Sequence, residues 1–403
     1  MSTPTIKLMS GIPVPVDSST AFMLDSTDLG VLDADTLAGD VDSEFVAPIR
    51  SITISRGRSR QFDRFQSGSA VISFYNADRK LDPLNEASEY YGKIAPRLRF
   101  QVLANDIPIY SGLATDWDFE YDIVDQDFAT VFCSDALTLF ANMTFDLTAS
   151  PGGPPGVTLK WVVDQVDYSG PIDFDTGNAN LGDYQIDAGT QVLDYMFRVA
   201  KSDDGKLFVS ADGVLEYFDR FGRGETADVD FADDGTGVPY MSLSNEYGDE
   251  LLYNYVNTES PAGSYEVFNQ ESLDSFGLAS LSYLDLLNNS VSGLEDIAKR
   301  YLEKFAFPQL RFTGLQVELA GLSSAQVTDI LNLDLGSLVT VKRTFSVGVP
   351  SSVTQQLFVS GISHQIRPGS HVVQFVFEPN PFLKFLRLSE SVRGKIDEDN
   401  VLG

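Results

Sequence analysis

The spacing of apolar residues changes twice along this chain, and the first change falls at a run of Pro and Gly at residues 151–156. Before that run, over residues 49–133, apolar and polar residues alternate as they do in half-buried strands. After the run the spacing becomes helical at 159–166 and 192–200, and the alternation returns beyond residue 238. The sequence therefore predicts a mainly β protein with an α/β insertion between two β regions.

These changes of spacing divide the chain into five predicted segments. Residues 8–49 carry eight acidic residues and no Lys or Arg, and their interspersed apolar residues are typical of an extended arm that lies along a neighbour. A helix is predicted at 292–305, because a capping box begins at Ser292 and Pro308 stops the pattern. The predicted segments are an extended N-terminal arm (1–45), a first β domain (46–150), an α/β insertion domain (151–237), a second β domain with the packed helix 292–305 (238–380) and a C-terminal segment (381–403).

Charge argues against one class of function. The chain has 58 Asp and Glu, 28 Lys and Arg, and a formal net charge of −30, whereas general DNA binding needs a basic surface. Residues 50–99 are the exception, with ten basic and five acidic residues. Two interpretations of this segment stay open: a basic face that meets an acidic face of another copy, or ordinary surface ion pairs. No secretory signal and no membrane-length apolar run occurs, so we expect a soluble protein with no membrane insertion.

Few residues could carry chemistry. Cys133 is the only cysteine, so an intrachain disulfide and a multi-cysteine zinc site are excluded, and its alternation with apolar residues predicts burial. The two histidines, His364 and His371, flank a Pro-Gly turn; a structural role is favoured over a metal site because no carboxylate is near them in sequence. Residues 173–177 begin like a calcium loop, but the pattern then fails, so an acidic turn is favoured and calcium at a border between subunits stays open. No P-loop, dinucleotide-binding motif or nucleophile elbow is present, so we predict no enzyme, no cofactor and no metal.

Residues 68–99 predict a strand, a polar turn and a rigid excursion that leads into a second strand. Pro83 fixes one backbone angle and restricts Asp82 to extended geometry. The candidate interface residues combine positions of this excursion with the arginines just before it. They are Arg56, Arg58, Arg60, Arg64, Asn76, Asp78, Arg79, Asp82, Pro83, Tyr91, Gly92 and Arg97.

The stretch from residue 55 to 102, SRGRSRQFDRFQSGSAVISFYNADRKLDPLN…YYGKIAPRLRFQV, resembles the first barrel of phage tail-tip hub proteins. These are also called baseplate hub or minor tail proteins of long-tailed phages. The likeness continues at 271–277 (ESLDSFG), in the helix near residue 300 and at 307–319 (FPQLRFTGLQVEL). It continues again at 335–379 (LGSLVTV…FVSGISHQIRPGSHVVQFVFEP), and it covers about residues 45–380 in all.

The resemblance implies that the two β domains are tube-like β-barrels and that three copies of the chain form a ring. It implies a structural role in the virion tail tip, made in the host cytoplasm, where the ring joins the six-fold tail tube or distal tail ring to a three-fold central fibre. The implied partners are the chain itself, the distal tail protein, the tail tube, the tape-measure protein and the fibre or other minor tail proteins. No specific nucleic-acid binding is expected.

Two alternatives stay open. A six-copy distal tail protein also contains such a barrel, although only one per chain. A tail-associated cell-wall hydrolase or a receptor- or glycan-binding adhesin belongs to another class. The hydrolase stays open because glycoside hydrolysis needs only two carboxylates at a set separation, and 58 acidic residues point to no particular pair.

Overall fold

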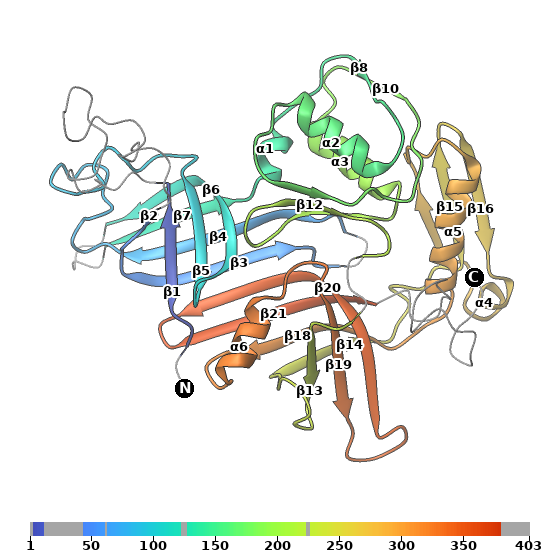
Figure 1. Cartoon of the computed structure of the whole chain (residues 1–403). Coiled ribbons are helices and arrows are strands. Elements are labelled where there is room, and N and C mark those ends of the chain that lie inside the picture. The colour runs from blue at the N-terminus through green and yellow to red at the C-terminus, as the bar shows by residue number, and fades with distance from the viewer. Residues whose placement is uncertain (1–2, 12–42, 61–62, 122–126, 223–225, 380–403) are drawn as a thin grey trace.

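A computed structural model of the chain describes residues 3–11, 43–60, 63–121, 127–222 and 226–379. It is mainly β with an α/β insertion, as the sequence predicted. Most of the strands join one 13-stranded sheet (Figure 1). No closed barrel is found among the described residues. In the same part of the chain no helix has the length and apolar character that a membrane span requires.

The first β domain supplies one side of the large sheet. Its elements are β1 (Ile6–Ser10), β2 (Ser43–Glu44), β3 (Ile49–Gly57), β4 (Gln66–Tyr75), β5 (Arg99–Ala104), β6 (Ile107–Glu120), β7 (Phe128–Ser134) and the short helix α1 (Leu137–Ala141). Alternation explains these strands, because β4 buries Ala70, Ile72 and Phe74 and turns the residues between them outward. Of the predicted arm, β1 pairs with β5 and β2, while residues 12–42 lie outside the described residues.

The second β domain supplies the other side of the sheet. Its elements are β13 (Val229–Ala232), β14 (Ser242–Glu246), β18 (Arg311–Glu318), α6 (Ser324–Leu331), β19 (Leu338–Thr344), β20 (Ser352–Arg367) and β21 (Ser370–Pro379). The sheet runs β14-β18-β21-β20 and continues directly into β3-β4-β7-β6-β5-β1-β2 of the first domain. Buried residues of the two β domains form one hydrophobic cluster, so the two domains share a core. The C-terminal segment 381–403 lies outside the described residues.

The seam between the two β domains is the antiparallel pair β3–β20, in which Ile54 lies opposite His364 and Gly57 opposite Gly361. Gly57 has a φ of +92°, and a Cβ built there would lie 2.3 Å from the carbonyl oxygen of Ser360. Only glycine fits this conformation and this close approach. The seam therefore depends on glycine at this position.

The α/β insertion lies between the first β domain and a third unit of the chain (Figure 1). It contains β8 (Thr148–Ala149), α2 (Pro155–Gln165), β9 (Ile172–Phe174), β10 (Gln185–Ile186), α3 (Val192–Lys201), β11 (Lys206–Val209) and β12 (Leu215–Phe218). The helices α2 and α3 bury their apolar faces in a separate core with β11 and β12. Pro155 begins α2, a position at which the missing N–H of proline costs nothing.

A third unit carries the helix that the sequence predicted at 292–305. It contains β15 (Tyr255–Ser260), β16 (Gly263–Phe268), α4 (Gln270–Phe276), β17 (Ser280–Tyr283) and α5 (Val291–Phe305). The strands form their own small sheet in the order β16-β15-β17. The apolar face of α5, including Leu294 and Ile297, packs with Val256 of β15 in a third core. The helix thus covers this small sheet, which lies beside the large one (Figure 1).

Candidate functional site

The four candidate arginines lie at the end of β3 and just beyond it, and the structure pairs each with a different part of the chain. Arg56 is buried, and its Nη1 donates to Oδ1 of Asp334 in the second β domain at 2.6 Å. The other carboxylate oxygen of Asp334 accepts from the backbone N–H of Ala211, beside β11. Arg56 therefore links the first domain to the second at a residue that also holds the α/β insertion.

Arg58 meets Glu378 of β21 inside the molecule, where Lys206 of β11 forms a second ion pair with the same carboxylate. Burial alone raises the pKa of Glu378, but the cations Lys206, Arg58 and Lys304 more than offset this and lower it to about 2. Burial also lowers the pKa of Lys304 to about 8, despite the attraction of Glu378. This carboxylate therefore stays charged and ties three parts of the chain together.

The remaining two arginines pair at the surface. Arg60 and Glu250 lie 3.3 Å apart with side chains that are 76% and 58% exposed. Arg64 pairs with Asp194 of α3, again with both side chains well exposed, and its guanidinium lies over the ring of Phe197. Exposed pairs of this kind contribute about 0–1 kcal/mol each.

The candidate residues at 76–82 make most of their side-chain hydrogen bonds within the excursion, although Asn76 also donates its backbone N–H to the oxygen of Asp127 at 2.8 Å. Asn76 is buried and its side-chain oxygen accepts from the N–H of Leu81 at 2.8 Å. Asp78 accepts from the N–H of Lys80 at 3.1 Å. Arg79 has a positive φ of 54° and donates Nε to the buried Asp82 at 2.7 Å. This part of the excursion is a polar turn, as the sequence predicted.

The rest of the excursion presents residues to solvent. Pro83, Tyr91, Gly92 and Arg97 are all exposed, and Gly92 and Arg97 have φ values of 72° and 68°. A Cβ at Gly92 would meet no atom within 4 Å. The structure thus splits the twelve candidates into arginines that join parts of the chain and a turn-rich surface segment. An interface role for that segment stays a prediction.

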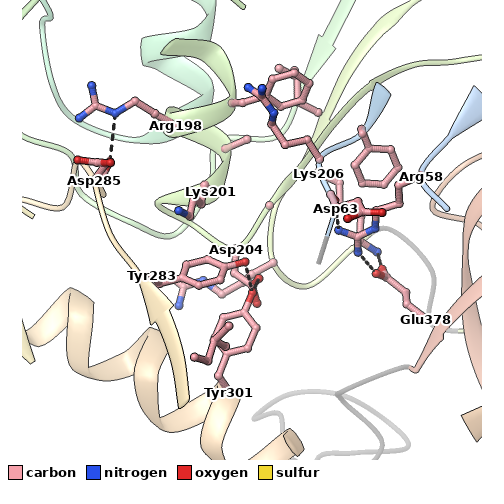
Figure 2. A pocket seen from close by; sticks show the side chains of 18 of the residues that line it. Arg58, Asp63, Arg198, Lys201, Asp204, Lys206, Tyr283, Asp285, Tyr301 and Glu378 are labelled. Atoms are coloured by element: carbon pink, nitrogen blue, oxygen red, sulfur yellow. Dashed lines mark hydrogen bonds and ion pairs between the residues drawn. The ribbon is translucent and has the colours of Figure 1, made fainter. Parts of the chain in front are cut away.

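A cavity of about 570 Å³ lies where the four units converge (Figure 2). Arg58 comes from the first β domain, α3 and β11 from the insertion, β17 and α5 from the third unit, and Glu378 from the second β domain. On the third-unit side, the hydroxyl of Tyr301 donates to Asp204 and lies 2.8 Å from the hydroxyl of Tyr283 (Figure 2). Burial, then the nearby Asp204, raises the pKa of both tyrosines, so both stay protonated.

The sequence did not single out Lys206, Lys304 or Glu378. Each lies in a strand or helix whose local spacing indicates only whether it is buried. Their convergence depends on the packing of units that are far apart in sequence. A buried Glu at the end of the alternating strand β21 is the one signal that could have pointed to the ion-pair centre.

The structure also shows the surroundings of the histidines, the cysteine and the acidic turn that were considered for chemistry. His364 and His371 are buried with Nδ1 of the first 3.1 Å from Nε2 of the second, and burial lowers the pKa of both. Cys133 is buried, which raises the pKa of its thiol to about 12. Asp173 lies in β9 opposite Glu216. Within the described ranges, no group of three or more His, Cys, Asp or Glu side chains is placed to hold a metal ion.

No family model and no curated protein matches this sequence. Solved structures match at the level of the fold. A tail protein from Neisseria meningitidis MC58 is 10% identical with a TM-score of 0.61, over 93% of this chain and 96% of that one. The prophage MuSo2 tail protein from Shewanella oneidensis is 12% identical with a TM-score of 0.56, over 85% and 97%. Prophage tail protein gp18 from Listeria monocytogenes is 8% identical with a TM-score of 0.50, over 92% and 94%. This chain therefore has the fold of phage and prophage tail proteins, which confirms the expected likeness at the level of the fold.

Proposed function

We propose that this chain is a non-enzymatic structural protein of a phage-type tail tip, in which three copies form a ring. The observation that carries the proposal is the β3–β20 seam, which sets two β domains side by side in one continuous sheet. The fold shared with tail proteins supports the same class of function. We propose the hub, or minor tail protein, as the particular role.

The two β domains that the seam joins would match the symmetry of the proposed assembly. A tail tube or distal tail ring has six-fold symmetry and a central fibre has three-fold symmetry. Two β domains in each of three copies place six β domains around one axis, so one face of the ring can mate with a hexamer and the other with a trimer. Each contact between copies should bury well over about 1,000 Å², as stable interfaces do.

The proposed partners follow from this position. Besides itself, the chain would contact the distal tail protein, the tail tube, the tape-measure protein and the fibre or other minor tail proteins. It would act in the virion after synthesis in the host cytoplasm. The net charge of −30 would keep passing DNA from adhering to a channel through the ring.

The copy number is the decisive measurement. Light scattering after size-exclusion chromatography of the full chain should give three times the 44.2 kDa of one chain, and electron microscopy of tail tips should show three-fold symmetry at this protein. A particle with six copies would refute the hub role in favour of the distal tail ring. Cleavage of host cell wall in a zymogram, or specific binding on a glycan array, would contradict the non-enzymatic structural assignment.

A further inference from the structure

Strand β17 lines the cavity between the four units, and one edge of this strand pairs with no other described strand. The third unit's sheet runs β16-β15-β17, so β17 pairs with β15 on one side, and in the part of the chain that the structure describes no strand pairs with its other side. Leu281, Ser282 and Tyr283 of this strand line the cavity. A free edge offers unpaired N–H and C=O groups to an extended peptide, which can bind as an added strand.

The cavity is cationic in an otherwise acidic chain. Seven Lys or Arg and five Asp or Glu line it, whereas the whole chain has a formal charge of −30. Two of these cations, Arg58 and Lys206, share the single carboxylate of Glu378. The lining therefore carries more positive charge than its own carboxylates neutralise.

Three cations that line the cavity form no direct ion pair with a carboxylate among the described residues. Arg198 donates Nε to the backbone oxygen of Asp285 at 3.1 Å (Figure 2). Lys201 donates Nζ to the backbone oxygen of Leu284 at 3.1 Å. The ammonium of Lys304 has neither a hydrogen bond nor an ion pair within the same residues, and lies over the ring of Phe305. Backbone oxygens leave the remaining donors of these side chains available to an anion.

We propose that this cavity binds an extended acidic peptide of a partner protein, which pairs with the free edge of β17. Successive side chains of an added strand point to opposite faces, so acidic residues at alternate positions would all point the same way. Carboxylates on that face would meet Arg198, Lys201 and Lys304. The apolar side chains of Leu281 and Phe197, which also line the cavity, would receive the residues between. This site is independent of the copy number proposed above.

Fluorescence anisotropy with a labelled peptide of alternating Glu and Val, three of each, tests the proposal on the full chain. The matched peptide with Gln in place of Glu should bind at least about tenfold more weakly, because each charge-assisted hydrogen bond to a carboxylate is lost. Two further peptides carry N-methyl groups on either the Glu or the Val positions. Only one of the two should lose binding, because alternate residues of an added strand face the β17 edge.

Variants of the protein locate the site. Lys201→Gln and Lys304→Gln should each weaken binding of the Glu peptide about three- to tenfold. Lys299→Gln is the matched control, because Lys299 lies on the same helix as Lys304 but is 55% exposed and pairs with Glu295. It should leave binding unchanged. Circular dichroism and thermal melting establish whether each variant is folded. If Lys304→Gln does not fold, Lys201→Gln still tests the site.

Three results would overturn the proposal. Equal binding of the Glu and Gln peptides would show that the charge of the peptide does not contribute to binding. Equal binding of both N-methylated peptides would rule out pairing with the strand edge. Tripolyphosphate that binds more tightly than the Glu peptide, and loses affinity in the same lysine variants, would assign the cavity to a small anion instead. Light scattering on the same samples measures the copy number independently, so a loss of peptide binding can be told apart from a wrong copy number.

Discussion

Replacement of Glu378 by Gln should lower the free energy of unfolding by about 3 kcal/mol at neutral pH. The Glu378 side chain is only 6% exposed, and it pairs with Arg58 and Lys206, which are 15% and 14% exposed. The substitution keeps the shape of the side chain but removes its charge. Two largely buried cations would then lack a counter-charge, and removal of one partner from a buried ion pair typically costs about 3–5 kcal/mol.

The pKa of Glu378 gives a second estimate of the same magnitude. It falls from 4.5 to about 2 on folding, and a difference of about 2.5 corresponds to roughly 3 kcal/mol. Because the pKa is lower in the folded state, this stabilisation is fully present above pH 4.5 and is lost as the pH falls through about 2. The difference between the wild-type chain and Glu378→Gln should shrink over the same interval.

Urea denaturation followed by tryptophan fluorescence measures the effect, because Trp117 lies in β6 and Trp161 in α2, so both the sheet and the insertion contribute to the signal. The unfolding transition should shift to lower urea, since Glu378 joins β21 to β3 and to β11. Glu250→Gln is the matched control: its partner is also an arginine of the 56–64 segment, but the pair is exposed, so the change should stay within about 1 kcal/mol. A loss below about 0.5 kcal/mol in Glu378→Gln, or an equal loss in both variants, would refute the reasoning.

Three further predictions use the same denaturation and labelling methods. Gly57→Ala should destabilise the chain by about 3 kcal/mol, because of the strain of its positive φ and the close approach to Ser360. Gly92→Ala, with a φ of 72° and open space around the added Cβ, should cost only about 1 kcal/mol. Equal losses in the two variants would contradict the steric argument. His371 has a pKa lowered from 6.5 to about 4 by burial, so stability should fall as the pH drops from 6.5 towards 4, and His371→Gln should flatten that part of the profile. A maleimide should label the buried Cys133 thiol only after unfolding; rapid labelling of the native chain would contradict its burial.

Much of the large sheet could be predicted, because its strands bury one face. The strand predicted in the segment 68–99 is β4, with alternate residues buried. The turn between the two histidines does join β20 to β21, and both histidines are buried. Local alternation sufficed there because each strand's own residues record which side faces the core.

The third unit and the seam could not be predicted in the same way. The helix α5 has a clear apolar face, but nothing in that face specifies whether the small sheet or the large one covers it. Likewise the spacing of β3 and β20 indicates two strands without indicating that they pair with each other. Pairings between residues some 300 positions apart, such as Ile54 with His364, depend on the whole fold.

The distribution of charge follows the same division. The sequence left open whether the arginines near residue 60 meet another copy or pair within the chain, and the structure pairs Arg56, Arg58, Arg60 and Arg64 with four carboxylates of other units. The largely buried pairs of Arg56 and Arg58 therefore hold units of one chain together, whereas those of Arg60 and Arg64 lie at the surface. What remains for partners is a surface with a large acidic surplus, from which phosphates and other acidic chains are repelled. The proposed site for an acidic partner segment is therefore the cavity beside β17, where the described residues Arg198, Lys201 and Lys304 form no direct ion pair with a carboxylate.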